Sequence, residues 1–253
     1  MNGSINLTAD LGEGFGAYRM ADDTAMLDLV SAANIACGFH AGDPRIMERT
    51  VRACVERGVS IGAHPGLPDL VGFGRRTLDC TPHEAYTDVL YQLGALSAFV
   101  RAHGGRIAHV TPHGQLGHLT RRREDIADAV ARAARAFDEE IRVVSREGYL
   151  TEAAHRAGLR TGHVGFADRA YGDDGELVSR TLPGAVIDDP DEVVARVVRM
   201  ARERRVVTTG GRELEIKCDT VLVHGDTPGS VRLARAVAEG LAAAGVAIRP
   251  LED

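Results

Sequence analysis

The sequence predicts an α/β protein whose parallel strands close, or nearly close, into a barrel. Short apolar runs alternate with helical patterns along the 253 residues, in about seven strand–helix units. The connections are too long for hairpins, so the strands should be parallel with right-handed crossovers. An open, doubly wound sheet is the alternative. The length suits a single domain with one large core, and no low-complexity linker divides the chain.

The expected strands are short and apolar, and turn residues separate them from the helices. They cover residues 5–8, 33–37, 59–63, 107–110, 142–144, 162–166 and 220–223. One segment does not follow this repeat, because Thr209-Gly210-Gly211-Arg212 stands between two short alternating runs. It predicts a β-hairpin inserted near residues 206–218.

The expected helices begin at capping signals and carry apolar residues at helical spacing. They lie near residues 22–32, 44–57, 82–102, 122–137, 149–157, 189–203 and 228–244. Asp43-Pro44, Asp189-Pro190 and Thr227-Pro228 each place a capping side chain before a proline, which suits the first helical position. Thr81 and Glu84 have the spacing of a capping box.

Composition excludes several classes of protein. The formal net charge of −6 argues against a general nucleic-acid binder. No apolar stretch is long enough to span a bilayer, and the N-terminus lacks the pattern of a signal peptide. The four cysteines share no CxxC spacing, so we expect them to be reduced. These features predict a cytoplasmic enzyme with no membrane or nucleic-acid partner.

Titratable residues follow the ends of the expected strands. In a repeating strand–helix protein the carboxyl ends of parallel strands meet at one rim, where catalytic residues usually lie. The first strand leads to Asp10 and Glu13, and His40, His64 and His113 follow three other strands. Carboxylates and imidazoles at such a rim can act as acid, base or metal ligand. These five residues are therefore the candidate catalytic residues.

A second group of candidates would bind the substrate. The glycine- and proline-rich segment 62–76 predicts a structured loop over the barrel mouth that carries Arg75 and Arg76. The arginine fork suits a carboxylate or a phosphate. The remaining candidates follow the last strands of the repeat: Asp168, Arg169, His224 and Asp226. Asp226 could instead cap the last helix. His109 lies inside an expected strand, so we expect it to be a core residue.

Several motifs that would specify a known chemistry are absent. The segment from Asp10 to Gly16 fails the dinucleotide fingerprint, and its two acids would repel a phosphate. No H-x-H, H-E-x-x-H or cysteine cluster requires a metal, and no G-x-S-x-G elbow is found. The spacing therefore permits a metal in this chain without requiring one, and leaves the metal content open.

Together and in this order, the motifs resemble the LamB/YcsF family, whose members are also called the A subunit of 5-oxoprolinase. The resemblance runs from about residue 5 to residue 246, through segments 7–16, 33–44, 61–76, 112–114, 166–169, 183–185 and 223–226. It implies an irregular (β/α)7 barrel related to polysaccharide-deacetylase and glycoside-hydrolase barrels. It also implies ATP-dependent opening of the 5-oxoproline (pyroglutamate) lactam to L-glutamate. Two further 5-oxoprolinase subunits, B and C, would be the partners, with ATP and Mg²⁺ used by the complex.

The chain departs from the family pattern near the expected site. Thr111 stands where the family usually has a lysine, and Val164 stands where a glutamate is usual. Loss of the lysine removes a mobile positive charge, whereas the candidate acids and histidines are all present. We therefore expect a retained pocket for a small lactam or carboxylate, with altered specificity. Two alternatives stay open: a non-catalytic, ligand-binding member of the same complex, and a stand-alone metal-dependent amide hydrolase.

Overall fold

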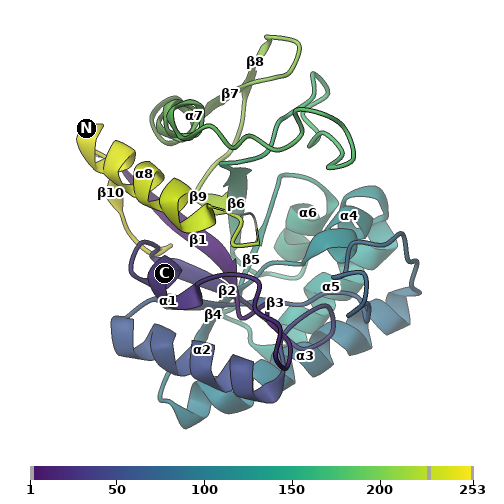
Figure 1. Cartoon of the computed structure of the whole chain (residues 1–253). Coiled ribbons are helices and arrows are strands. Elements are labelled where there is room, and N and C mark those ends of the chain that lie inside the picture. Colours follow the sequence, from purple (N-terminus) through teal and green to yellow (C-terminus); the bar gives the residue numbers. More distant parts are fainter. Residues whose placement is uncertain (1–2, 227–228, 252–253) are drawn as a thin grey trace.

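The computed structural model describes residues 3–226 and 229–251, and a closed parallel barrel lies at its centre (Figure 1). The barrel strands are, in order, β1 (Ser4–Leu11), β2 (Ala32–Ala36), β3 (Ser60–His64), β4 (Ile107–Val110), β5 (Arg142–Ser145), β6 (Thr161–Phe166) and β9 (Thr220–Val223). β9 pairs with both β6 and β1, which closes the ring. The predicted barrel of seven strands is confirmed, and the open-sheet alternative is wrong.

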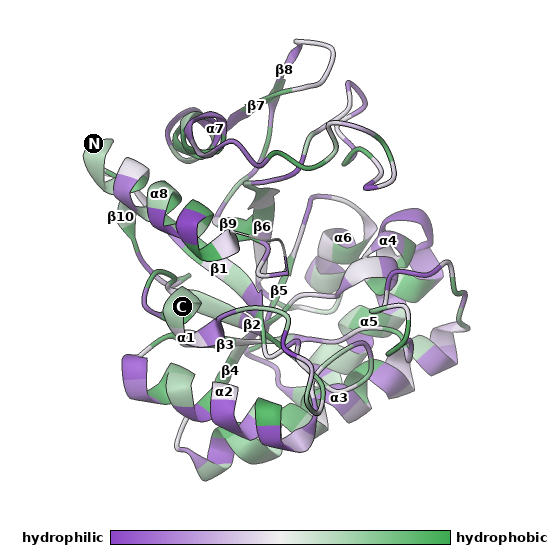
Figure 2. Ribbon diagram, in the orientation of Figure 1, coloured by the Kyte–Doolittle hydropathy of each residue, from purple (hydrophilic) through white to green (hydrophobic). Residues whose placement is uncertain are grey.

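Helices surround this barrel (Figure 1). They are α1 (Asp23–Leu27), α2 (Pro44–Arg57), α3 (Pro82–Ala102), α4 (Gly114–Arg122), α5 (Glu124–Phe137), α6 (Tyr149–Arg156), α7 (Pro190–Glu203) and α8 (Ser230–Ala243). Figure 2 shows α2, α3 and α5 as mixtures of hydrophilic and hydrophobic residues, as expected for helices that bury one stripe against the strands. None of the helices in the described residues has both the length and the apolar character needed to cross a bilayer.

The predicted helix starts have the expected cap geometry. The Asp43 carboxylate accepts hydrogen bonds from the backbone N–H groups of Arg45 and Ile46, and Thr81 and Glu84 form the capping box of α3. Asp189 caps α7 in the same way. The cap expected at Thr227-Pro228 lies outside the described residues.

Three elements differ from the sequence predictions. The helix expected over residues 22–32 covers only Asp23–Leu27, because the chain is already extended in β2 from Ala32 onward and is hydrogen-bonded there to β1 and β3. Helix α4 was not expected, since Gly114 and Gly117 obscure its helical pattern. The short strand β10 (Ala247–Ile248) was also missed, and it pairs with the start of β1 outside the ring.

The chain leaves the barrel between β6 and β9. This excursion contains α7 and an antiparallel hairpin of β7 (Arg205–Val207) and β8 (Glu213–Glu215), which lies at the top of Figure 1. The hairpin occupies the segment where the sequence predicts an insertion. Among the described cysteines, Cys37, Cys54 and Cys218 are free and buried, and burial raises the pKa of the Cys37 thiol to about 12.

Strand β1 explains why the inside of the barrel is polar. Its residues alternate, so that Leu7 and Ala9 pack into the apolar core while Asn6, Thr8 and Asp10 are buried on the opposite face. These polar side chains lie within a ring of parallel strands, where hydrogen bonds must replace lost water. The Asn6 carboxamide, for example, accepts a hydrogen bond of 2.5 Å from the hydroxyl of Thr220 on β9.

Candidate functional site

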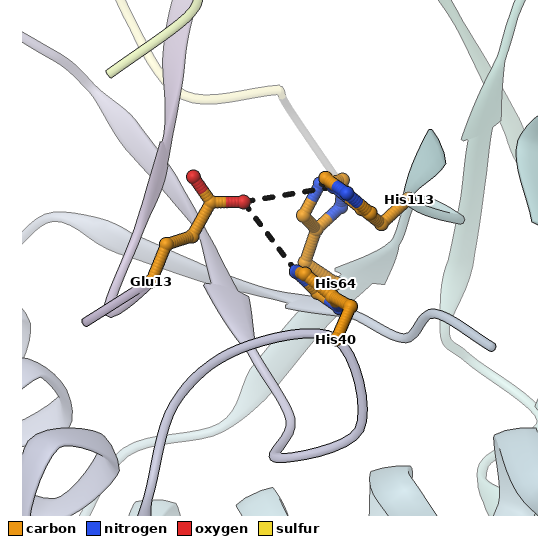
Figure 3. Close-up of side chains that lie close together, drawn as sticks. All are labelled: Glu13, His40, His64 and His113. Atoms are coloured by element: carbon orange, nitrogen blue, oxygen red, sulfur yellow. Dashed lines mark hydrogen bonds and ion pairs between the residues drawn. The ribbon is translucent and has the colours of Figure 1, made fainter. Parts of the chain in front are cut away.

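Four candidate residues meet at the carboxyl ends of four neighbouring strands. Glu13 follows β1, His40 follows β2, His64 ends β3 and His113 follows β4. Figure 3 shows the carboxylate of Glu13 pointing at the imidazole rings. Each side chain offers one ligand atom, and these atoms all lie within 4.8 Å of one another. We call these residues the Glu13–histidine cluster, and within the described part of the chain they could hold a metal ion.

The cluster is compact and buried. Glu13 Oε1 lies 3.4 Å from His40 Nε2 and 3.6 Å from His113 Nδ1. The rings of His40 and His113 stack with centroids 3.8 Å apart, and His64 meets both rings edge-on. No side chain of the cluster is more than 5% exposed. Such tight contact between titratable groups is typical of functional sites.

Glycines in the loop after β3 make this packing possible. A Cβ on Gly74 would lie 2.7 Å from His40 Cβ and 2.8 Å from His113 Cδ2, and a Cβ on Gly66 would lie 2.6 Å from His40 Nδ1. The same loop carries Phe73, whose φ of +54° is unusual for a bulky residue. The glycine-rich segment 62–76 is therefore the wall against which the imidazoles pack.

Backbone carbonyls orient two of the imidazoles. His64 Nδ1 donates a hydrogen bond to the carbonyl oxygen of Thr111 over 2.7 Å, and His113 Nε2 donates to that of Phe73 over 2.8 Å. The remaining ring nitrogens, His64 Nε2 and His113 Nδ1, face each other at 3.0 Å. The carbonyl hydrogen bonds therefore fix the orientation of both rings, and the other nitrogen of each ring faces the interior of the cluster.

Asp10 lies beside the cluster and is held by a chain of hydrogen bonds. His109 Nε2 donates to Asn34 Oδ1 over 2.7 Å, and Asn34 Nδ2 donates to Asp10 Oδ1 over 2.9 Å. Asp10 Oδ1 also lies 3.5 Å from His64 Nε2. A Cβ on Gly62 would lie 2.0 Å from His109 Nε2, so glycine leaves the space that the His109 ring fills.

The two carboxylates have opposite pKa shifts. Burial opposes ionisation of Asp10, but His64, His224 and the Asn34 amide outweigh it and lower the pKa of Asp10 below its usual range. Burial and repulsion from Asp10 and Asp226 raise the pKa of Glu13 well above its ordinary value. A pair of acids driven apart in this way is the usual arrangement for acid–base chemistry.

A second imidazole–carboxylate pair lies at the same end of the barrel. His224, after β9, has Nδ1 at 2.8 and 3.0 Å from the two carboxylate oxygens of Asp168, which follows β6. Burial opposes ionisation of Asp168, but His224 lowers its pKa overall. Because this carboxylate orients the ring, His224 Nε2 is available to exchange a proton with a bound molecule.

The candidate arginines have different surroundings. Arg75 Nη1 forms a 2.7 Å ion pair with Asp226 Oδ2, and its guanidinium lies over the Phe73 ring. Asp226 is therefore a partner of Arg75, and no hydrogen bond among the described residues shows it capping α8. Arg76 instead pairs with Asp69, its side chain is 59% exposed, and the structure does not bring it to the cluster. Arg169 donates to the carbonyl oxygens of Ala185 and Val178 and so fastens the excursion before α7.

The sequence motifs match the model of the LamB/YcsF family over residues 5–253. The chain belongs to this family. It is 47% identical to the A subunit of 5-oxoprolinase from Bacillus licheniformis, over 97% of each chain. It is 50% identical to the protein of the same name from Azoarcus, over 95% of this chain and 94% of that protein.

A solved LamB/YcsF relative has the same fold throughout. The lactam utilization protein of Thermus thermophilus superposes with a TM-score of 0.92 at 44% identity, covering 97% of this chain and 99% of that chain. More distant barrels include a polysaccharide deacetylase from Bacillus cereus, with a TM-score of 0.50 at 13% identity. A β-hexosaminidase from Streptomyces plicatus has a TM-score of 0.52 at 12% identity. The last two support only the likeness of the fold.

The two departures from the LamB/YcsF pattern have structural explanations. At position 111 the backbone carbonyl is what contacts His64, and the Thr111 hydroxyl donates to the carbonyl oxygen of Val144. Val164 packs with Val144 and Leu222 in a small apolar cluster. Threonine and valine therefore fit these places without a charged partner, and the site retains its other charged groups.

Some residues around the cluster were not predicted from the sequence. Arg180 in the excursion acts electrostatically on Asp168, Asp226 and Arg75, and its Nη2 is buried without a hydrogen-bond partner in the described residues. No local pattern marks this arginine. The polar Asn34 within the apolar run 33–37 was the available signal for the support of Asp10.

Two hollows of the described structure lie away from the cluster. One, of about 560 Å³, lies between the segment after Glu13 and helix α2, and it is lined by residues that include Tyr18, Arg49 and Thr50. The other lies beside β10 and α8. At the Glu13–histidine cluster itself, the Phe73 ring meets the rings of His40 and His113 edge-on, and Arg75 lies over the Phe73 ring.

Proposed function

We propose that this chain is the A subunit of a 5-oxoprolinase, which opens the lactam of 5-oxoproline to L-glutamate with hydrolysis of ATP. The relatives at 42% to 50% identity carry the name of this subunit. The observation that carries the proposal is the convergence of Asp10, the Glu13–histidine cluster and the His224–Asp168 pair at one end of the barrel. Such a set of groups suits the hydrolysis of an amide.

The reaction adds one water molecule across the lactam C–N bond. An ionised Asp10 takes a proton from the attacking water, and the His224 imidazolium, held by Asp168, donates a proton to the leaving nitrogen. Resonance stabilises the lactam and its five-membered ring has little strain. Transfer of the ATP γ-phosphoryl group to the carbonyl oxygen, with release of ADP, would explain why ATP is used. Water addition and C–N cleavage would then give an acyl phosphate, which a second water molecule hydrolyses to glutamate and phosphate.

The substrate carboxylate needs a cationic partner. Arg75 lies at the site beside Asp226, and Arg180 acts electrostatically on both of these residues. A guanidinium can bind a carboxylate through two parallel hydrogen bonds. We assign the recognition of the carboxylate to these two arginines, since Arg76 pairs with Asp69 away from the cluster and Arg169 donates to backbone carbonyl oxygens of the excursion.

We expect ATP and Mg²⁺ to act through the partner subunits B and C. The glycines that follow β1 lie next to Asp10 and Glu13, so this segment is a poor cradle for phosphate groups. The relatives are named as one lettered subunit of 5-oxoprolinase, which implies a complex with more than one kind of chain. A cytoplasmic location, where ATP is available, fits this proposal.

Reconstitution tests the proposed function. The chain is mixed with its cognate B and C subunits, ATP, Mg²⁺ and 5-oxoproline, and the formation of glutamate and ADP is measured. We expect both products only when all three proteins are present. No glutamate from the full mixture, or the same amount without this chain, would refute the proposal.

The Glu13–histidine cluster favours one alternative, a stand-alone metal-dependent amide hydrolase. This alternative predicts that the chain alone, supplied with Zn²⁺, opens small lactams without ATP. Glutamate formation from 5-oxoproline by the isolated chain would support it. Complete dependence on ATP and the partner subunits would exclude it.

A further inference from the structure

In the Glu13–histidine cluster, lone pairs of neighbouring ring nitrogens face each other with no hydrogen atom between them. A carbonyl oxygen only accepts hydrogen bonds, so His64 Nδ1 and His113 Nε2, which contact carbonyls, must carry the ring hydrogens. In the neutral rings His64 Nε2 and His113 Nδ1 are then both lone-pair acceptors, yet they lie only 3.0 Å apart. Two acceptors at this distance need an electron-pair acceptor between them, which is either a proton or a metal ion.

Protons do not satisfy the cluster. A proton between His64 and His113 leaves Glu13 Oε1 and His40 Nε2 without a hydrogen-bond partner among the described residues, and both atoms are fully buried. A second proton, on the Glu13 carboxyl whose pKa is raised, does not give these two atoms a good hydrogen bond, since they lie 3.4 Å apart. Buried polar atoms without a partner are rare, because each costs about 1–3 kcal/mol. A single cation among the four side chains accepts electron pairs from both of these atoms and from the two facing ring nitrogens.

We propose that Glu13, His40, His64 and His113 bind one divalent transition-metal ion of the zinc class. The distances between ligand atoms are 3.0, 3.4 and 3.6 Å for the pairs given above. These three values lie close to the edge of about 3.3 Å that a tetrahedron with metal–nitrogen bonds of about 2.0–2.1 Å requires. The other pairs of ligand atoms lie within 4.8 Å, so the stacked rings of His40 and His113 must tilt when the ion binds. Three imidazoles and one carboxylate favour Zn²⁺ and its neighbours over Mg²⁺ or Ca²⁺, which prefer oxygen ligands.

The surroundings of the cluster resemble the support that metal-binding histidines usually have. The non-ligating nitrogens of His64 and His113 each donate to a backbone carbonyl, which fixes the tautomer and the ring orientation. Asp10 Oδ1, 3.5 Å from His64 Nε2, adds negative charge beside the ion. Gly66 and Gly74 let the backbone pass close behind His40.

The ion would give the cluster a chemical role in the opening of the lactam. A zinc-class ion acts as a Lewis acid that polarises a carbonyl oxygen or lowers the pKa of a bound water. This role rests on the proposed function, whereas the binding of the ion does not. The metal therefore has to be tested by a measurement that is independent of turnover.

Metal content and spectroscopy provide this measurement. The isolated chain is stripped with a chelator, incubated with excess Zn²⁺ or Co²⁺ and dialysed, and the bound metal is quantified by mass spectrometry. We expect about one equivalent per chain, with visible Co²⁺ absorption of the intensity typical of a four-coordinate site. A chain that retains no metal after dialysis would overturn the proposal.

Variants locate the ion. Glu13→Gln preserves shape, and we expect it to weaken Zn²⁺ binding at least about tenfold, with His113→Gln weakening it further. The matched control is His163→Gln, which removes a histidine of β6 that pairs with Asp219 outside the cluster, and it should bind as the wild type does. Circular dichroism verifies that each variant is folded. If His113→Gln does not fold, Glu13→Gln and the Co²⁺ spectrum of the wild-type chain still test the site.

The outcomes separate metal binding from the proposed function. Binding that is unchanged in Glu13→Gln and His113→Gln would place the ion elsewhere and refute the site. If the wild-type chain binds one equivalent of metal and these variants do not, the result supports the site even if the reconstituted complex forms no glutamate. Glutamate formation by a complex in which this chain binds no metal would refute the site and leave the proposed function intact.

Discussion

At the scale of single residues, Asp10 is held by hydrogen bonds that run from His109 through Asn34 across the inside of the barrel. Asp10, His40, His64 and His113 were predictable because each follows or ends an apolar strand run. The hydrogen bonds from His109 through Asn34 to Asp10 were not, since they join side chains of three strands across the inside of the barrel. Interactions of this kind depend on closure, which leaves no local trace in the sequence.

The Asp168–His224 pair gives a prediction about turnover. Asp168→Asn should lower kcat of the reconstituted complex by about 10²-fold or more, with little change in KM, because the imidazolium loses the carboxylate that stabilises it. The control is Asp219→Asn, which breaks a similar carboxylate–imidazole pair with His163. Steady-state kinetics should show the loss only in Asp168→Asn, and equal losses in both variants would contradict the assigned role.

Arg180 gives a prediction about substrate binding. Arg180→Gln should raise KM for 5-oxoproline by about 10- to 100-fold, as expected for loss of a charge-assisted hydrogen bond worth about 1.5–3 kcal/mol. Arg202→Gln, on the exposed side of α7, is the control and should leave KM unchanged. An unaltered KM in Arg180→Gln would remove this residue from the substrate site.

At the scale of helices and loops, caps and glycines determine where elements begin and what can pack beside them. The caps at Asp43, Thr81 and Asp189 were predictable from residue type and proline position. The close packing of the loop after β3 against the imidazoles was not predictable. A glycine in the sequence does not show which side chain fills the space that its missing Cβ leaves free. Gly74 has a φ of +64° and lies against two rings of the cluster.

Gly74 gives a prediction about stability. Gly74→Ala should lower the free energy of unfolding by about 1–3 kcal/mol, because its methyl group meets His40 and His113 and its φ disfavours a side chain. Gly94→Ala is the control, since Gly94 lies in α3 with no neighbour within 4 Å of a Cβ. Urea denaturation should show that Gly94→Ala is neutral or up to about 1 kcal/mol stabilising. Equal changes in the unfolding free energy of Gly74→Ala and Gly94→Ala would contradict the close packing of Gly74 against the two imidazoles.

Glu176 gives a prediction about pH. Partial burial opposes its ionisation, but hydrogen bonds from Arg121 and Arg146 lower the pKa of Glu176 to about 2, from an ordinary value of 4.5. A lowered folded-state pKa stabilises the protein above the ordinary value, and this stabilisation is lost as the pH falls toward 2. Glu176→Gln should therefore cost about 1 kcal/mol at neutral pH, a modest value because the side chain is half-exposed.

Urea denaturation of the wild type and of Glu176→Gln at several pH values tests the direction of this pH dependence. The difference in unfolding free energy should be constant above about pH 5 and shrink between about pH 4.5 and pH 3. Glu203→Gln is the control, since no ion pair of this residue is found among the described residues. A difference that is independent of pH would contradict the assigned ion pairs.

At the scale of the whole molecule, closure of the barrel creates the site. Pairing of β9 with β1 brings Asp226 and His224 beside residues more than two hundred positions earlier in the chain. The sequence predicted this closure only through the number of strand–helix units. The excursion before β9 was predictable as a hairpin, but not as the source of Arg180, because the path of a long connection depends on packing.

The most direct test of the central claim, that the converging residues form the catalytic site, is the rate of glutamate formation by the reconstituted complex with Asp10→Asn. We expect a fall of at least about 10²-fold from the wild-type rate, because an amide cannot accept the proton from water. The control His163→Gln should retain the wild-type rate. An undiminished rate in Asp10→Asn, with the same dependence on this chain, would contradict the account.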